Sequence, residues 1–341
     1  MRGDSQPSRR RSGVTLTDVA KLAGVSEITV SRIIRNKGPA ADRTRDKVMA
    51  AVKAVGYVRN RVAGSLASAD SNLIGVIIPS LSNIVFPEVL RGVSAALEAS
   101  GFQAVVGVTN YNLAAEEGLV SSMLGWKPAA MIVTGAEHTE ATRRFLEQSG
   151  VRIAELMDID AKPIDIAVGL SHRRAGYDTG AYLIARGYRR FGYVGHDWNA
   201  DRRARLRYDG LVEALRENGL SLVDQAIGDG PSSTLAGRAL LADLLKRSPT
   251  IDVAVFSNDD MAVGGVFHCM AANIKVKQDL ALFGFNGLEI GQSLPAPLST
   301  IRSNRYLIGR VSVEKIIESP LRGKDPIVVD TGYEIMPGAT A

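Results

Sequence analysis

The stretch Thr15 to Asn36, TLTDVAKLAGVSEITVSRIIRN, predicts two short helices joined by a tight turn. Thr15 is expected to cap the first helix, with Asp18 at the matching third position and Gly24 ending it. Ser26 is expected to cap the second helix, which buries an apolar face and leaves a mostly polar and basic face outward. Such a helix, after a turn of small residues, is typical of a helix-turn-helix recognition helix. On this stretch alone, the alternative is a plain helical hairpin with a solvated charged face.

The charge of the chain is unevenly distributed, and this favours a DNA-binding head. Residues 1–61 carry 14 Lys and Arg against 5 Asp and Glu, a net charge of +9, whereas the remaining residues carry a net charge of −4. A positive field concentrated on one small domain suits the phosphate backbone of nucleic acid. We therefore predict a basic disordered arm at residues 1–13 and an all-α helix-turn-helix DNA-binding domain at residues 14–58, completed by a third helix over 42–55.

Residues 59–72 form the expected linker, which can order as a hinge helix when something binds it. This segment is too short and too rich in Gly and Ser to be a stable helix alone. Leu66 is its residue of interest, because an apolar side chain can insert between base steps in a minor groove. The alternative is a disordered linker with an incidental leucine.

Residues 73–341 show a different pattern, in which buried strands alternate with amphipathic helices, beginning with LIGVIIP. Continuous apolar strands separated by helices predict parallel sheets that are covered on both faces. The alternation repeats, which predicts an α/β body of two doubly wound subdomains. A ligand is expected in the cleft at the carboxyl ends of their strands.

Composition favours a cytoplasmic protein. A single cysteine, Cys269, excludes an internal disulfide framework and fits a reducing compartment. The chain contains no run of about 18 apolar residues, so no membrane span is expected. The basic N-terminus lacks the following apolar segment that a secretory signal requires.

The sequence contains no convincing catalytic constellation, so we expect neither an enzyme nor a cofactor or metal site. There is no P-loop and no G-x-S-x-G motif, and the four histidines are scattered. Polar residues instead recur just past strand ends, including four arginines at positions 202, 203, 205 and 207. Carboxylates and amides that converge from several strand ends suit a polyhydroxylated ligand, and an arginine can bind a carboxylate with two hydrogen bonds.

These motifs together resemble the lactose-repressor family of bacterial transcription regulators. The head carries TLTDVAKLAGVSEITVSRIIRN and KVMAAVKAVGYVRNRVAGSL, and the body carries IGVIIPSLSNIVFPEVLRGV, NDDMAVGGVF and LFGFNGLEIGQ. Within that family the chain is most similar to the gluconate-operon repressors, through SMLGW, ELMDID and PIDIAVG. The resemblance extends from about Thr15 to Pro337.

The resemblance implies a periplasmic-binding-protein-like body, residues 73–341, that binds an effector and dimerises. Three crossovers near residues 170, 302 and 325 would divide it into an N-subdomain (about 73–170 and 303–324) and a C-subdomain (about 171–302 and 325–341). The implied DNA-binding residues are Thr15, Ser26, Glu27, Ile28, Thr29, Ser31, Arg32 and the hinge residue Leu66. The implied effector-binding residues are Ser80, Asn83, Phe86, Asp158, Arg207, Asn258, Asp260 and Asn286.

One departure from the family pattern bears on the ligand. The family commonly has an aspartate where Asn286 stands, and the loss of a negative charge at that position favours an anionic ligand such as a sugar acid. The chain ends soon after Pro337, which leaves no room for a C-terminal tetramerising repeat, so a homodimer is expected.

The leading hypothesis is a cytoplasmic homodimeric repressor that binds a palindromic operator in double-stranded DNA. A small sugar acid, with gluconate as the first candidate, would release it. One alternative is a corepressor-type regulator of the same family that binds another sugar or small metabolite. A second is a solute-binding receptor without a regulatory role, and a third is an enzyme on the same fold.

Overall fold

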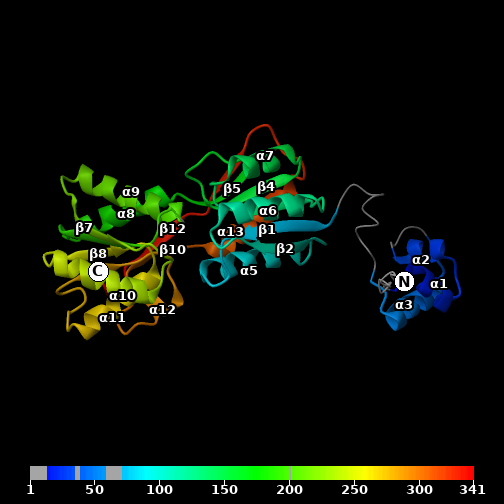
Figure 1. The fold of residues 1–341 in the computed structure, drawn as a ribbon, viewed down its shortest axis with the longest axis horizontal. Coiled ribbons are helices and arrows are strands. Elements are labelled where there is room, and N and C mark those ends of the chain that lie inside the picture. Colours follow the sequence, from blue (N-terminus) through cyan, green and yellow to red (C-terminus); the bar gives the residue numbers. More distant parts are fainter. Residues whose placement is uncertain (1–13, 35–38, 59–70, 200) are drawn as a thin grey trace, which may run out of the picture. The chain divides into compact units, whose positions relative to one another are not determined.

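The computed structural model describes residues 14–34, 39–58, 71–199 and 201–341 (Figure 1). They belong to two compact units, Met1–Ala69 and Asp70–Ala341, each with a hydrophobic core of its own. We refer to the first unit as the head and to the second as the body. The basic arm expected at residues 1–13 and the hinge expected around Leu66 lie outside the described residues.

The described residues of the head form three helices, α1 (Leu16–Ala23), α2 (Glu27–Ile34) and α3 (Asp42–Val55). The Thr15 hydroxyl accepts a hydrogen bond from Asp18 N, and the Asp18 carboxylate accepts one from Thr15 N at 2.8 Å. This capping box confirms the predicted start of α1. Gly24 ends α1 with φ at 67°, a left-handed conformation that glycine adopts without side-chain strain.

Buried side chains from all three helices make the core of the head, and they are Val19, Ala20, Val30, Ile33, Val48 and Ala51. Tyr57 packs against this core directly after α3. The core is small, as is usual for a domain of this length.

The first sheet of the body has six parallel strands in the order β11-β5-β4-β3-β1-β2. Their bounds are β1 (Leu73–Ile78), β2 (Gln103–Val108), β3 (Ala130–Thr134), β4 (Arg152–Asp158), β5 (Ile166–Leu170) and β11 (Ile327–Asp330). The accompanying helices are α5 (Val85–Leu97), α6 (Leu113–Leu124), α7 (Glu140–Gln148) and α13 (Arg305–Glu318). The central strands are almost entirely buried, which explains their continuous apolar sequences.

The second sheet has four parallel strands in the order β7-β6-β8-β9. Their bounds are β6 (Phe191–Gly195), β7 (Leu222–Ile227), β8 (Val253–Phe256) and β9 (Ala281–Phe283). The helices of this half are α8 (His172–Ala185), α9 (Arg202–Glu217), α10 (Thr234–Arg247), α11 (Asp259–Ala271) and α12 (Glu289–Gln292). The sequence did not predict β7, because this half-exposed edge strand contains Asp and Gln between its apolar residues.

The chain passes three times between the two halves of the body. It crosses from β5 to α8, from β10 (Thr300–Ser303) to α13, and from β11 to β12 (Tyr333–Met336), and β10 pairs with β12 in an antiparallel ladder. The predicted third crossover near residue 325 is wrong. Ile327–Asp330 runs parallel to β5 in the first sheet, with Ile327 N donating to Asp165 O at 2.8 Å. The crossover therefore lies between Asp330 and Tyr333, and the first subdomain extends to residue 330.

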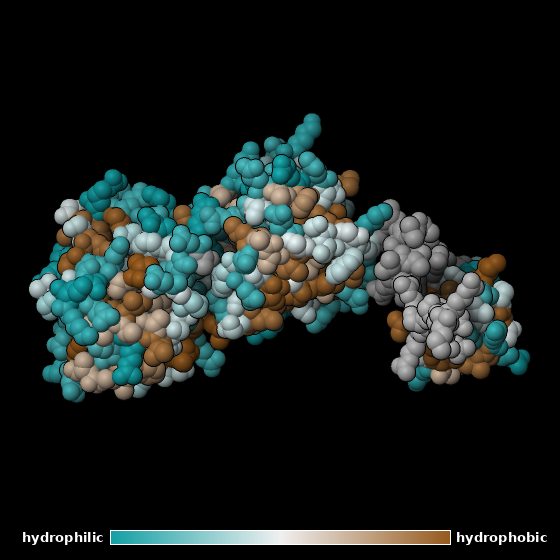
Figure 2. Space-filling view, in the orientation of Figure 1, coloured by the Kyte–Doolittle hydropathy of each residue, from teal (hydrophilic) through white to brown (hydrophobic). Residues whose placement is uncertain are grey.

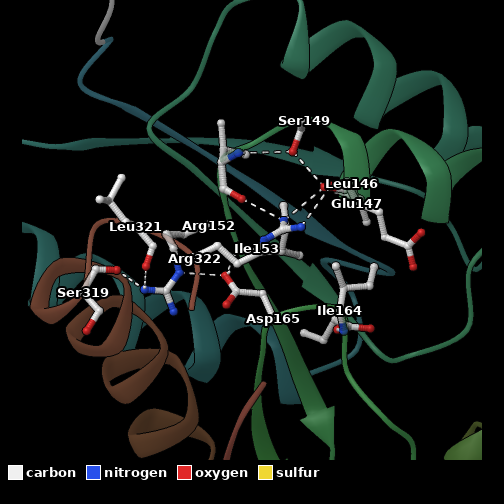
Figure 3. Close-up of polar contacts among 12 residues, drawn as sticks. Leu146, Glu147, Ser149, Arg152, Ile153, Ile164, Asp165, Ser319, Leu321 and Arg322 are labelled. Atoms are coloured by element: carbon white, nitrogen blue, oxygen red, sulfur yellow. Dashed lines mark hydrogen bonds and ion pairs between the residues drawn. The ribbon is translucent and has the colours of Figure 1, made fainter. Parts of the chain in front are cut away.

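Two arginines that share one carboxylate tie the segment after α13 to the first sheet (Figure 3). Arg152 Nε donates to Asp165 Oδ2 at 2.7 Å, and Arg322 Nε lies 3.8 Å from the same oxygen. Arg152 also donates to the carbonyls of Ser319 and Leu321. Arg322 donates to three carbonyls at the end of α7 and in the loop after it. This cluster holds the ends of α7 and α13 in fixed positions beside β4.

The surface of the body mixes hydrophilic and hydrophobic residues on the face that Figure 2 shows. The large apolar side chains exposed on the body include Val106 on β2, Leu235 on α10, and Phe267 and Met270 on α11. Among the described residues, no helix is long and apolar enough to cross a membrane.

Candidate DNA-binding surface and effector pocket

The outward face of α2 presents most of the residues expected to bind DNA. Glu27 and Arg32 are exposed, and Ile28 is 81% exposed. Thr29 and Ser31 are partly exposed beside them. An arginine and an apolar side chain on one helix face can contact a guanine edge and a thymine methyl group, respectively. The described part of the head thus offers a surface with the chemistry of a recognition helix.

Hydrogen bonds within the head hold the N-terminal end of α2, which carries part of this surface, in place. Ser26 Oγ accepts from Thr29 N at 3.2 Å, and the two hydroxyls lie 2.9 Å apart. The Thr17 hydroxyl donates to Glu27 Oε1 at 2.6 Å, which links α2 to α1. The Thr15 hydroxyl is engaged in the cap of α1. Glu27 and Thr15 therefore have roles in the fold beside the DNA contacts expected of them.

A pocket lies in the body between its two halves, where the strands of the first sheet end. It is lined by residues that follow β1, β2 and β3, by the end of β4 and by the start of α9, including Thr109, Tyr111, Glu137, Asp158, Asp201 and Arg203. An ion pair of 3.6 Å between Glu137 and Arg202 joins its two walls. The carboxyl ends of parallel strands are where ligands bind in folds of this kind.

The loop after β1 forms one wall close to this pocket. The Ser80 hydroxyl accepts hydrogen bonds from Ser82 N and Asn83 N, which shapes the loop. Asn83 Nδ2 donates to the Tyr111 hydroxyl at 2.9 Å. Phe86 is buried behind the loop. The structure thus places Ser80, Asn83 and Phe86 together, next to a tyrosine that the sequence analysis did not select.

Asp158 and Arg203 face the pocket from opposite halves of the body. Asp158 Oδ1 accepts from Asp160 N at 2.8 Å, and burial raises the pKa of the Asp158 carboxyl. Arg203 Nε donates to Asp201 Oδ1 at 3.1 Å, and its guanidinium lies 5.5 Å from the centre of the Phe86 ring. Although burial opposes ionisation of Asp201, the nearby Arg203 and His196 hold its pKa well below the usual range. The pocket therefore combines carboxylates with a positive charge.

Arg207 does not line this pocket. Its Nη1 lies 3.0 Å from His172 Nδ1, its Nη2 donates to Ser257 O at 2.8 Å, and its guanidinium stacks 4.1 Å from the centre of the Phe285 ring. His172 Nε2 lies 2.9 Å from Met157 O. Burial and the positive charge of Arg207 lower the pKa of His172 well below its usual value, so the ring is neutral, with Nε2 as donor and Nδ1 as acceptor. Arg207 faces a separate small cavity beside Phe285.

The three remaining predicted effector residues are tied to the second half. Asn258 caps α11 by accepting from Met261 N at 3.3 Å, and Asp260 accepts from the Ser232 hydroxyl, also at 3.3 Å. Burial raises the pKa of the Tyr111 hydroxyl, and the negative charge of Asp260 acts in the same direction. Asn286 has a φ of 122°, and its carbonyl accepts a hydrogen bond from Arg305. None of Asn258, Asp260 and Asn286 is among the residues that line the pocket.

The neighbouring Asp259 is the aspartate that organises this region. Its carboxylate accepts hydrogen bonds from Leu288 N and the Thr300 hydroxyl, both at 2.6 Å. The residue is fully buried, and burial raises the pKa of its carboxyl to about 6. Asp259 therefore connects the start of α11 to the crossover strand β10.

A buried histidine between two glutamates supports the wall opposite α9. His138 Nδ1 lies 2.6 Å from Glu116 Oε1, and Nε2 lies 3.5 Å from Glu155 Oε1. Although burial opposes the imidazolium form, the contacts with Glu116 and Glu155 raise the pKa of His138 to about 9. Among the residues that the structure describes, no cluster of three or more His, Cys, Asp or Glu is arranged to hold a metal ion.

Sequence reasoning did not select Tyr111 or Arg203, which line the pocket, whereas Arg207, which it selected, is not among the lining residues. Tyr111 follows β2 in the way that Ser80 follows β1, so the same position past a strand end would have identified it. For the arginines no local signal exists, because positions 203 and 207 lie one helical turn apart and have similar neighbours in the sequence.

A helix-turn-helix head and a two-lobed α/β body with a polar pocket together define a ligand-responsive regulator that binds DNA. The model of the lacI family of bacterial regulatory proteins matches residues 15–60, and the model of the periplasmic binding proteins and sugar binding domain of the LacI family matches residues 71–325. The chain belongs to the LacI family, and it is a DNA-binding transcriptional regulator with a periplasmic-binding-protein-like body.

The relatives agree over nearly the full length. The HTH-type transcriptional regulator GntR of Pseudomonas aeruginosa is 36% identical over 325 residues, which cover 94% of each chain. A crystal structure of a LacI-family transcriptional regulator from Silicibacter pomeroyi is 43% identical, with a TM-score of 0.90 over 96% of this chain and 99% of that one. The lac repressor dimer bound to operator, at 24% identity and a TM-score of 0.81 over 96% of this chain and 99% of that one, shares the fold.

Proposed function

We propose that this regulator is a repressor whose effector is a small sugar acid, with gluconate as the first candidate. The observation that carries the proposal is that Asp158 and Arg203 line one pocket from the two halves of the body, beside Tyr111. A carboxylate accepts hydrogen bonds from ligand hydroxyl groups, and a guanidinium binds a ligand carboxylate. A ligand that carries both groups on a short chain matches this pocket.

The proposal includes a homodimer that binds a palindromic operator in double-stranded DNA. Exposed apolar side chains on β2, α10 and α11 supply surface that a second copy can cover. A two-fold dimer would present two α2 helices to two half-sites, and an inverted repeat has the same symmetry. Of the expected DNA contacts, the role of Leu66 in the hinge stays a prediction from the sequence.

In this proposal the effector acts by differential affinity. A ligand shifts the equilibrium between two conformations only to the extent that it binds one of them more tightly. Both halves of the body contribute to the pocket, so a bound sugar acid favours one relative arrangement of the halves. Release from DNA follows if that arrangement is incompatible with the spacing of the two heads. The proposal also includes that this regulator is cytoplasmic and is not an enzyme.

The test is DNA binding of the full chain with and without gluconate. A duplex would be selected from random-sequence DNA, and its affinity measured by fluorescence anisotropy at fixed salt, because salt changes such affinities strongly. Saturating gluconate is expected to weaken binding to the selected duplex by about 5- to 150-fold, the usual range of allosteric coupling. A non-selected duplex serves as the control.

Two other results would change the conclusion. If gluconate binds the protein but leaves operator affinity unchanged, the effector mechanism is refuted. If gluconate tightens binding, the protein is a corepressor-type regulator, which is the alternative within the same family.

A further inference from the structure

Glu116 lines the effector pocket from the first half of the body. It lies in the first turn of α6, directly after the cap that Asn112 provides. A carboxylate at this end of a helix is stabilised by the partial positive charge of the unpaired backbone N–H groups. That effect favours an acidic residue at a position that is only 5% exposed, but it leaves open what the two carboxylate oxygens bind.

One oxygen of this carboxylate is engaged in the protein interior. Glu116 Oε1 lies 2.6 Å from Nδ1 of His138, whose side chain is fully buried. Although burial opposes the charged form of His138, its contacts with Glu116 and Glu155 raise its pKa to about 9. The ring is therefore an imidazolium, and Nδ1 donates to Oε1. This hydrogen bond holds the Glu116 carboxylate in one orientation.

The second oxygen of Glu116 lacks such a partner. Among the residues that the structure describes, no hydrogen bond or ion pair reaches Oε2. Because Oε1 is turned toward His138, Oε2 is the oxygen that is left to face the pocket. A carboxylate oxygen with so little access to bulk water requires a hydrogen-bond donor, since a buried charge without one is costly. The pocket is the source of that donor.

We propose that Glu116 is a specificity-determining residue, whose Oε2 accepts a hydrogen bond from one hydroxyl group on the carbon chain of the effector. This inference rests on the proposed sugar-acid effector. An ionised carboxylate only accepts hydrogen bonds, so Glu116 binds a hydroxyl group and repels the carboxylate of the ligand. Arg203 belongs to the other half of the body. The ligand is thus oriented with its carboxylate toward α9 and its hydroxylated chain toward α6.

The experiment compares gluconate with the deoxygluconates that each lack one hydroxyl group, in calorimetric titrations of the full chain. All these ligands carry the same carboxylate, so a change in pocket charge affects them alike, and the ratio of each affinity to that of gluconate is the readout. In the wild type, loss of the contacting hydroxyl is expected to cost about 10- to 100-fold, the range for a hydrogen bond to a charged group. Glu116→Gln keeps an oxygen for His138 and replaces Oε2 by an amide NH2. It is expected to reduce that one ratio by about 10-fold and to leave the others at their wild-type values.

Glu117→Gln is the matched control, because Glu117 is the next residue of α6, accepts from the Thr139 hydroxyl at 2.7 Å and is not among the residues that line the pocket. It should keep every wild-type ratio. Glu116→Asp retains the charge but withdraws the carboxylate, so it should change the same ratio as Glu116→Gln, and it decides the question if the Gln variant does not fold. Glu116 variants in which no ratio changes, or in which all change together, overturn the inference. A wild-type protein that binds none of these ligands refutes the sugar-acid effector itself.

Discussion

The buried cluster of His138, Glu116 and Glu155 is expected to make the free energy of unfolding of the body fall at alkaline pH. The imidazolium lies between Glu116 and Glu155, with its side chain fully buried. Its pKa is raised from 6.5 to about 9 in the folded protein. Because the folded state favours the charged form, this stabilisation is fully present below pH 6.5 and is lost as the pH rises through about 9.

The size of the effect follows from the same two values. At about 1.4 kcal/mol for each pKa unit, the rise from 6.5 to about 9 corresponds to about 3 kcal/mol. Replacing His138 by Gln removes the charge at every pH and leaves two buried carboxylates without a cation. The variant should therefore be less stable than the wild type by about 2–3 kcal/mol at pH 7, and the two proteins should converge near pH 10.

Urea unfolding between pH 6 and pH 10 measures this difference. Both tryptophans of the chain, Trp126 and Trp198, lie in the body, so their fluorescence reports on the unit that contains His138. Other groups that titrate in this range affect the wild type and the variant alike and cancel in the difference. His268→Gln, at a partly exposed position on α11, is the matched control. A difference between wild type and His138→Gln that does not change with pH would refute the ion-pair account.

Three further predictions concern the head, the hinge and the polar cluster of the first sheet. Arg32→Ala is expected to cost about 1–3 kcal/mol on the selected operator if it reads a guanine, measured by anisotropy; an equal loss on random DNA would mean that it contacts only phosphate. Leu66→Ala is expected to weaken operator binding and spare non-specific binding, and no change in either would exclude insertion into the minor groove. Asp165→Asn leaves Arg152 and Arg322 without their shared carboxylate and is expected to destabilise the body by about 3–5 kcal/mol in urea unfolding. A loss below about 1 kcal/mol would show that the carbonyl contacts alone hold the cluster.

The prediction of effector-binding residues used only one kind of information, which is the position of a residue just past the end of a strand. Past the end of a parallel strand the chain must turn at the ligand-binding edge, so Ser80, Asn83 and Asp158 were identifiable by position. Position in the sequence alone does not reveal which side chains form hydrogen bonds with other parts of the protein. Arg207 illustrates this, since its hydrogen-bond partners His172 and Ser257 are 35 and 50 residues away.

The sequence also could not predict the environment of His138, because its two partners are distant in the chain. Glu116, His138 and Glu155 come from a helix, a loop and a strand, and nothing in the spacing of the four histidines marks this one. The third crossover was misplaced because Ile327–Asp330 has a pattern that fits the edge of either sheet. Strand pairing depends on a partner that is distant in the chain, and local sequence carries no record of it.

The sequence by itself determined the parts of this protein that depend on neighbouring residues. The cap at Thr15, the end of α1 at Gly24, the buried Val30 and the alternation of strands and helices all follow from interactions within a few positions. Only the tertiary structure decided which arginine lines the pocket, which sheet receives β11, and which carboxylates surround His138. These outcomes depend on burial and on contacts between distant segments, which exist only once the chain has folded.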